Sequence, residues 1–479
     1  MPPFPPLLSA LDMEANIEFG PDGLPGGEFR EPETYFLVEC PLWARYPVPV
    51  PRKLEFLARS MQDLQAMGLT ALHTMGLGLP EEDLETLILL LELEQTGQLG
   101  IRVSGSMSVI PDEHMHGDLE RAVQVRDLLA DGRQGRKTYA QVHAALLELL
   151  DAASAPRGVH RTSAHLKDVF EHVVHGLHQR LQRAHYREHE KHHERLGNDP
   201  SRTGFMAPDG MIAWNTVKLF MDGVVEKDTS FRFDTPACAG IPAYSPERLT
   251  AVLEYADRAG MQVAAHCIGN ASVARFLDAV EVVRARHANL DAKRGHRIRH
   301  RIEHIETCRA RDIPRFTRLG VVASMQPLHE REPVRLWHQK VPEHEWATAF
   351  PWKLILESGG MLTFGSDWPI VSCNALESIA HATTRQPWRP GYPQAALSPA
   401  EALAGFTSGP ALTRHAEARR GKIKPGMAAD LVLLKATELS EQVRVQATIS
   451  KGKVVYDAGR AKQPTRQELE TLQISKEFP

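Results

Sequence analysis

Residues 246–267 read PERLTAVLEYADRAGMQVAAHC. The first part, Pro246–Ala259, has the apolar spacing of a helix that buries one face, and Gly260 follows it as a stop signal. The next run, Gln262–His266, is short and apolar, which predicts a buried strand that ends on a histidine. A helix that leads straight into such a strand is the repeating unit of a parallel sheet with helical crossovers.

The same alternation continues in both directions along the chain. The predicted strands are Leu69–Thr74, Ile101–Val109, Thr216–Asp222, Gln262–His266, Arg299–Ile305, Val321–Gln326 and Met361–Phe364. The predicted helices are Arg52–Met67, Leu84–Glu94, Pro246–Ala259, Ala274–Arg286, Ala310–Leu319 and Pro351–Ser358. Seven strands are one fewer than a closed barrel needs, so we predict an α/β fold of the (β/α)8 TIM-like type that lacks its first strand.

The length and composition of the chain are ordinary for a soluble globular enzyme. With 479 residues it is expected to hold a large catalytic domain and a smaller one. A formal net charge of -4 argues against nucleic acid or an anionic membrane as the main partner. Five scattered cysteines without a CxxC pair, and no signal-like or membrane-spanning run, predict a cytoplasmic protein in a reducing compartment. A homodimer is left open.

The texture of the chain divides it into three parts. Residues 1–50 are rich in Pro and Gly and are expected to be irregular, with one short strand at Tyr35–Val38; residues 51–415 form the barrel, and residues 416–479 a small β domain with strands Ala429–Leu434 and Val443–Val455. A helical insertion is expected at about 118–208, where 9 of the 23 histidines lie between His160 and His193. His185, His189 and His192 share one helical face there, which is either an adventitious metal site or, as we favour, a solvated helix of mixed charge.

Four side chains at the ends of the later strands can carry chemistry: Lys218, His266, His304 and Asp367. Alone, each has an ordinary explanation, since a strand-end histidine is more often a hydrogen-bonded core residue and Asp367 can cap a helix. The carboxyl ends of barrel strands meet at one mouth, so together they predict a site for Zn²⁺ or a similar ion. A desolvated Lys218 amine can also take up carbon dioxide and become an oxygen ligand.

Ordered motifs around these residues resemble the amidohydrolase superfamily, and within it the YtcJ-like group, also called the amidohydrolase 3 family. The motifs are Val-Lys-Leu-Phe-Met-Asp-Gly (217–223), Ala-His-Cys-Ile-Gly-Asn-Ala (265–271), Arg-Ile-Glu-His-Ile-Glu (301–306) and Leu-Thr-Phe-Gly-Ser-Asp-Trp-Pro (362–369). The resemblance implies hydrolysis of a carbon–nitrogen bond other than a peptide bond in a small-molecule amide. It implies one or two metal ions, with His266 and His304 as ligands, Lys218 as a carbamate bridge, and Asp367 as ligand and as the base for the attacking water.

The chain departs from the family at its beginning. The family carries His-x-His on the first barrel strand, whereas the first histidine here is His73. The only His-x-His, His114–His116, follows the predicted strand Ile101–Val109, which is the third of the barrel when the missing strand is counted, and it is expected to be a decoy. We expect the missing strand to be encoded upstream, and the chain as given to have little hydrolase activity beside an extended form. The alternative function is a catalytically impaired barrel that acts as a binding or regulatory protein.

Overall fold

The computed structural model describes residues 17–19, 25–29, 46–76, 80–111, 114–153, 188, 210–233, 243–331, 334–393, 395–435 and 443–459. The expected strand at Tyr35–Val38 and the histidines at 185, 189 and 192 lie outside these residues.

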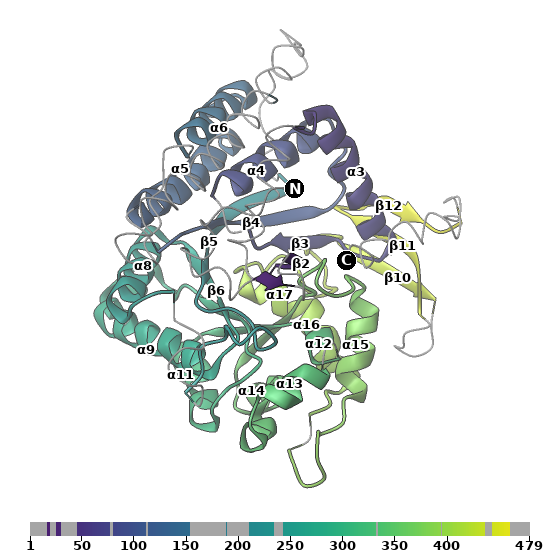
Figure 1. The fold of residues 1–479 in the computed structure, drawn as a ribbon. Helices are drawn as coiled ribbons and strands as arrows, with labels where there is room; N and C mark the ends of the chain where they lie inside the picture. The colour runs from purple at the N-terminus through teal and green to yellow at the C-terminus, as the bar shows by residue number, and fades with distance from the viewer. Residues whose placement is uncertain are drawn as a thin grey trace.

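The centre of the molecule is a curled parallel sheet whose strands follow one another in chain order (Figure 1). Its strands are β3 (Ala71–Thr74), β4 (Arg102–Ser108), β5 (Ile212–Phe220), β6 (Gln262–Cys267), β7 (Arg301–His304), β8 (Val322–Met325) and β9 (Met361–Phe364). Each pairs in parallel with the next, and β3 and β9 are the two edges of the sheet within the described residues. The predicted strand-and-helix alternation is therefore confirmed.

Helices surround this sheet (Figure 1). They are α3 (Val50–Ala66), α4 (Pro80–Gln95), α5 (Met115–Arg133), α6 (Tyr139–Ala153), α8 (Pro246–Ala259), α9 (Asn270–Arg286), α10 (Ala288–Arg294), η3 (Ala310–Asp312), α11 (Ile313–Leu319), α12 (Pro327–Arg331), α13 (Val334–Lys340), η4 (Glu343–Thr348), α14 (Trp352–Glu357), α15 (Ala375–Thr384), α16 (Pro399–Phe406) and α17 (Ser408–Thr413). None of the described helices has the length and apolar composition that a membrane crossing requires.

Helix α8 shows how local sequence sets these boundaries. The Ser245 hydroxyl accepts the backbone N–H of Arg248, and a proline occupies the first turn. Such a cap is worth about 1 kcal/mol. Gly260, with φ of 72°, ends the helix in the left-handed conformation that a residue without Cβ adopts at little cost. The buried face of Leu249, Val252 and Leu253 then packs into the core.

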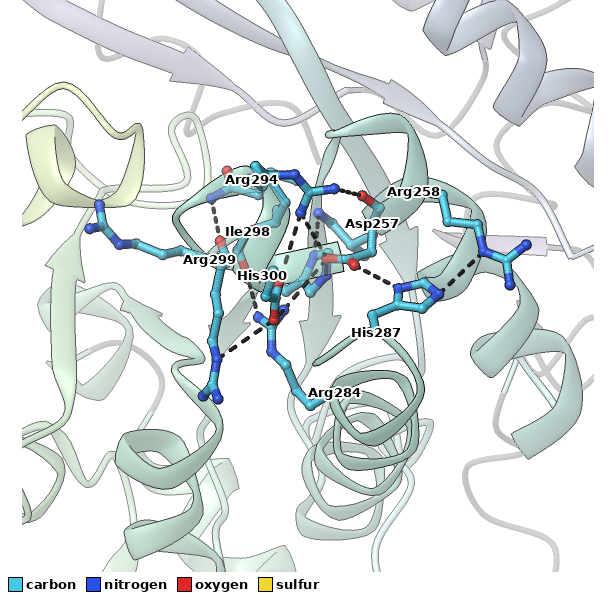
Figure 2. A network of polar contacts seen from close by, with 12 residues as sticks. Asp257, Arg258, Arg284, His287, Arg294, Ile298, Arg299 and His300 are labelled. Carbon is cyan, nitrogen blue, oxygen red and sulfur yellow. Dashed lines mark hydrogen bonds and ion pairs between the residues drawn. The ribbon is translucent and has the colours of Figure 1, made fainter. Parts of the chain in front are cut away.

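A buried polar network ties α8 and α9 to the amino-terminal end of the sheet (Figure 2). His287 Nδ1 donates a 2.7 Å hydrogen bond to the Asp257 carboxylate, which also lies 3.5 Å from Arg284 Nη1 and from His300 Nε2. His300 Nδ1 accepts the backbone N–H of Val263 on β6. Burial alone would raise the pKa of Asp257, but the His300 and His287 contacts and the Arg284 charge outweigh it and hold that pKa well below its usual value.

The two accessory parts differ in detail from expectation. Helices α5 and α6 are the described portion of the expected insertion, and residues 17–29 include a two-stranded antiparallel sheet of β1 (Ile17–Phe19) and β2 (Pro25–Phe29). The C-terminal sheet comprises β10 (Leu431–Lys435), β11 (Arg444–Ser450) and β12 (Lys453–Asp457), all antiparallel. The single strand predicted over Val443–Val455 is wrong, because Lys451 and Gly452 both have positive φ and turn the chain back on itself.

Two contacts fasten this small sheet to the barrel. Arg102 Nε on β4 donates to the Asp430 carboxylate at 2.8 Å, and both side chains are about nine-tenths buried. The Thr448 hydroxyl donates to the backbone carbonyl of Gln65 near the end of α3 at 2.6 Å. The expected packing of a small β unit beside the barrel is thus observed.

Candidate metal centre

The four residues singled out from the sequence all lie toward the carboxyl ends of the strands. Lys218 is on β5, His266 on β6, His304 is the last residue of β7, and Asp367 follows β9. The sheet register sets Phe220 of β5 beside His266, and Cys267 beside His304. This end of the sheet is where enzymes of barrel architecture place their active sites.

Backbone strain accompanies two of these residues. His304 has φ of 76° and Asp367 has φ of 56°, a conformation that costs residues with a Cβ roughly 1 kcal/mol or more. Nothing in the sheet itself requires it, since β7 has already ended at His304 and β9 at Phe364. Backbone strain of this kind gathers at functional sites.

His304, Asp367 and a third residue, His329, form the tightest group of ligating side chains among the described residues. One ligand atom from each lies within 4.8 Å of the other two. The His304 and His329 rings are stacked, with centroids 5.6 Å apart and planes 12° from parallel. His304 Nδ1 and His329 Nε2 are buried without a hydrogen-bond partner, and an unpaired buried nitrogen is costly unless something else binds it. Two imidazoles and a carboxylate fit zinc or a similar ion.

His266 adjoins this group without belonging to its tightest set. Its ring centroid is 4.4 Å from that of His304, in an edge-on arrangement. His266 Nε2 lies 3.1 Å from the Gly223 carbonyl, and a carbonyl only accepts, so the proton is on Nε2 and the Nδ1 lone pair remains for a ligand. Burial, helped by the Lys218 charge, lowers the pKa of His266 to about 3 and keeps the ring neutral, as metal binding requires.

Asp222 holds the loops around His266 in place. Its carboxylate accepts the backbone N–H groups of Phe231, Ile268 and Gly269 at 2.8–3.1 Å. One oxygen is also 3.8 Å from His266 Nε2. Burial raises the pKa of Asp222 to about 7, and the three backbone bonds limit that rise. The carboxyl group therefore joins the β5 loop to the β6 loop and orients the imidazole between them.

Lys218 lies deeper in the barrel, with 3 % of its surface exposed. Its Nζ is 4.5 Å from the centre of the Phe220 ring, and no carboxylate of the described residues comes within the 4.0 Å of an ion pair. Burial lowers the pKa of Lys218, and the negative charges of Glu303 and Asp367 partly offset this. An amine in this state loses its proton more readily than one in water.

Sequence reasoning missed His329 and its neighbour Glu306. His329 belongs to α12, the short helix directly after β8, and its side chain is about nine-tenths buried. The motif Met-Gln-Pro-Leu-His (325–329) carried a signal, because a histidine three residues beyond an apolar strand remains at the same end of the sheet. Glu306 lies inside a motif already noted, two residues after His304.

Other histidines fall outside the centre. His116 is mostly exposed on α5, where it pairs with Glu120 at 3.2 Å, and neither it nor His114 belongs to the group of ligating side chains found in the described residues. His73 on β3 is bonded to the Ser106 hydroxyl at 2.9 Å and to Arg301 at 3.2 Å. Both ring nitrogens of His73 therefore already have partners within the protein.

Comparisons with known proteins agree with this picture of the chain. The sequence profile described as "Amidohydrolase family" matches residues 46–456. Protein LONG AFTER FAR-RED 3 of Arabidopsis thaliana is 33 % identical over 253 residues, covering 50 % of this chain and 42 % of that protein. Putative amidohydrolase YtcJ of Bacillus subtilis is 25 % identical over 261 residues, or 51 % and 48 % of the two chains. An N-substituted formamide deformylase of Arthrobacter pascens is 25 % identical over 262 residues, or 53 % and 47 %.

The chain thus matches about half the length of the curated relatives. Among solved structures, an uncharacterized metal-dependent hydrolase from Pyrococcus furiosus is similar with a TM-score of 0.53 at 20 % identity, over 88 % of this chain and 67 % of that one. A second, from Pyrococcus horikoshii, has a TM-score of 0.52 at 17 % identity, over 95 % and 70 %. This likeness shows the fold, a TIM-like barrel with a small antiparallel sheet.

Proposed function

Since the chain belongs to the amidohydrolase family, and within it to the YtcJ-like group, we propose that it is a metal-dependent hydrolase of small-molecule amides that cleaves a carbon–nitrogen bond other than a peptide bond. The observation that carries the proposal is the meeting of Asp367 with two imidazoles whose buried nitrogens lack partners. In this proposal His266 and His304 are metal ligands, Asp367 is a ligand and the catalytic base, and Lys218 supplies a carbamate oxygen.

Asp367 is suited to the proton-transfer role. Zinc, when bound, would lower the pKa of a water from about 15.7 toward about 7 and polarise the amide carbonyl. The Asp367 side chain is 36 % exposed, so water and substrate reach it. Its carboxylate takes a proton from the water as oxygen bonds to the amide carbon, and returns that proton to nitrogen as the carbon–nitrogen bond breaks. The products are a carboxylic acid and an amine.

Lys218 is suited to carbamate formation for physical reasons. The buried amine has a lowered pKa and no close carboxylate among the described residues, so its neutral form is accessible. A neutral amine attacks carbon dioxide, loses one proton and becomes an anionic carbamate. His266 is on the adjoining strand β6 and His304 on the next strand, β7, and the Lys218 charge acts on both imidazoles, so a carbamate oxygen would lie near them.

Apolar side chains around the mouth bear on the substrate. Phe220, Trp368 and Ile370, here called the apolar rim, are 40 %, 54 % and 69 % exposed although all three are large and hydrophobic. Phe220 is 5.6 Å from the His266 ring, and Trp368 directly follows Asp367. The name of the Arthrobacter relative states action on N-substituted formamides. We infer an amide with an apolar substituent, which would cover the rim when it binds.

From the sequence we further propose zinc as the metal, a cytoplasmic location, and domain limits at residues 1–50, 51–415 and 416–479. No described feature favours the alternative of a barrel that binds without hydrolysing, because Asp367 and the imidazoles are arranged for proton transfer and metal binding together.

The test compares the 479-residue chain with a form extended to an upstream start. Bound zinc is measured by elemental analysis, and hydrolysis is followed on a panel of N-formyl and N-acyl amines. Activity in either form that disappears with His304→Ala supports the proposal. A chain that binds no metal and cleaves no amide in either form would contradict it and leave the non-hydrolytic alternative.

A further inference from the structure

His329 has a carboxylate on each side of its ring. Its Nε2 is 3.8 Å from Asp367 Oδ2, and its Nδ1 is 3.8 Å from Glu306 Oε1. We propose that His329 is a metal ligand of this chain, so that His304, His329 and Asp367 form a three-ligand site of their own at the barrel mouth. The inference rests on the proposed function in that both need an ion at this mouth, but it assigns a residue that the family motifs above do not include.

The distance between His329 and Asp367 is compatible with an ion bound between them. A hydrogen bond between imidazole and carboxylate is about 2.7–2.9 Å long, and His329 and Asp367 are 3.8 Å apart. Two ligands of one tetrahedral zinc, at about 2.0–2.1 Å from the metal, are about 3.4 Å apart. The observed separation is close to that spacing, and the third residue, His304, has its ligand atom within 4.8 Å of both. Small side-chain rotations close the remaining gaps.

The unpaired ring nitrogen of His329 is a second observation that points to a metal ligand. Its side chain is nine-tenths buried, yet Nε2 has no hydrogen-bond partner. His73 is paired with Ser106 and Arg301, but His300 Nε2 at the other end of the sheet also lacks a hydrogen-bond partner, so the position of the His329 nitrogen decides. The unpaired Nε2 instead points toward Asp367, the group proposed as base and ligand.

Glu306 supplies the outer partner that a ligating histidine normally has. Metal-bound imidazoles usually donate their second N–H to a carboxylate, which fixes the ring and increases its basicity. Here Glu306 Oε1 lies 3.8 Å from His329 Nδ1, beyond hydrogen-bond length but close enough to accept its N–H after a small rotation of the ring. Glu306 Oε2 accepts the indole N–H of Trp337, on α13, at 3.1 Å. Glu306 and Trp337 are both buried. They act as positioning residues through His329.

The helix that carries His329 is firmly anchored on its other side. The neighbouring residue Glu330 accepts a 2.6 Å bond from His381 on α15 and bonds from the Trp388 indole, and lies 3.4 Å from Arg385. Rigid support of this kind holds a first ligand in place before the ion arrives. His329 thus faces the barrel mouth, whereas Glu330 faces the surrounding helices.

Zinc binding to the 479-residue chain tests the inference with a matched pair of variants. His329→Gln and His329→Glu have similar size, but the glutamate keeps an anionic oxygen ligand and the amide is a poor one. We expect His329→Gln to weaken zinc at least about 100-fold in a chelator competition, and His329→Glu to restore most of the loss. Zinc-edge X-ray absorption should count one imidazole fewer in both variants than in the wild type. Glu306→Gln should weaken zinc about 10- to 100-fold.

His116→Gln is the control, since it changes an exposed histidine on α5 that lies outside the ligand group; it should leave zinc affinity within about twofold. Unchanged affinity and an unchanged imidazole count in His329→Gln would overturn the inference while leaving the proposed function intact. Absence of zinc from the wild type in both the given and the extended form would overturn both. If His329→Gln does not fold, the imidazole count of His329→Glu and the affinity of Glu306→Gln decide the matter.

Discussion

Asp257 and Asp367 each lie beside two histidines, at opposite ends of the same sheet. At the amino-terminal end, Asp257 is fully buried, accepts a 2.7 Å bond from His287 and lies near His300 and Arg284 (Figure 2). At the carboxyl end, Asp367 is exposed, and its nearest histidine nitrogen, on His329, is 3.8 Å away. Both sets combine an aspartate with two histidines, so these residue types alone do not distinguish them.

What distinguishes them is the state of their polar atoms. In the Asp257 network both ring nitrogens of His287 are hydrogen-bonded, one to Asp257 and one to Arg258. His300 accepts the N–H of Val263 on Nδ1, and its Nε2, although without a hydrogen-bond partner, lies 3.5 Å from the Asp257 carboxylate. In the Asp367 group each of the two histidines, His304 and His329, has a buried nitrogen without a hydrogen-bond partner, and the nearest one is 3.8 Å from the carboxylate. Paired groups stabilise the fold, whereas unpaired buried groups cost free energy until a ligand arrives. The difference predicts that one cluster governs stability and the other governs chemistry.

The largest expected effect is on activity at the carboxyl end. Asp367→Asn removes the base while preserving the shape of the side chain, and we expect kcat to fall about 10²- to 10⁴-fold. The free energy of unfolding should change by less than about 1 kcal/mol, because Asp367 is exposed and has no close partner in the described residues. Steady-state kinetics on the amide panel measure the change in kcat, and urea unfolding measures the change in the free energy of unfolding. Retained kcat would remove Asp367 from the catalytic role.

The next effect is the converse one, on stability at the amino-terminal end. Asp257→Asn leaves the buried Arg284 with only the Asp291 carboxylate, 3.8 Å away, and weakens the bond from His287. Removing one partner from a buried charged network costs about 3–5 kcal/mol, so the free energy of unfolding should fall by that amount. Zinc affinity of the folded variant should be unchanged, as the control that separates the two ends. Equal effects of Asp257→Asn and Asp367→Asn on stability would contradict the comparison.

The free energy of unfolding should depend more steeply on acid in the wild type than in Asp257→Asn. The pKa of Asp257 is held below its usual value, so the stabilisation it brings is complete above about pH 5 and is lost as the pH falls further. Burial lowers the pKa of His300, so the unfolded chain takes up a proton below about pH 6.5 that the folded chain does not. Both groups make acid destabilising. Below pH 5 the wild type should lose up to about 1.4 kcal/mol per pH unit more than Asp257→Asn.

Urea unfolding of the two proteins at pH 7, 5 and 4, with chelator present to remove metal, measures these slopes. Parallel slopes below pH 5 would show that Asp257 takes no part in the acid response.

Much of the fold followed from periodicity, and the reason is local. Helix α8 and strand β9 were predicted with their observed bounds, because a capping serine and glycines mark the ends. His266, His304 and Asp367 could be placed because a strand has a direction, so residues at successive carboxyl ends meet at one edge. Non-local pairing has no such signature.

His329 and Asp257 illustrate what the sequence could not supply. His329 is on a helix of five residues, and which way that helix turns depends on contacts of Glu330 with residues about 50 positions away. The Asp257 network joins residues 27 to 43 positions apart from three different segments, none of which carries a motif. The turn at Lys451 and Gly452 was missed because the apolar residues on both sides of it have the pattern of one continuous strand.

The smallest expected effect concerns the apolar rim. Ile370→Ser should raise KM about 3- to 10-fold for amides with an apolar substituent and leave kcat unchanged, because burying roughly 40 Å² of apolar surface contributes about 1 kcal/mol to binding. Ile423→Ser is the matched control, since Ile423 is 88 % exposed and lies between α17 and β10, far from Asp367 in the sequence. It should change neither constant. The rise in KM should also shrink for N-formyl amines whose substituent is a single methyl group, which has too little surface to reach the rim. An equal rise for small and large substituents would mean that Ile370 acts through the position of Asp367, whose carbonyl accepts the Ile370 N–H at 2.9 Å, and not by contact with substrate.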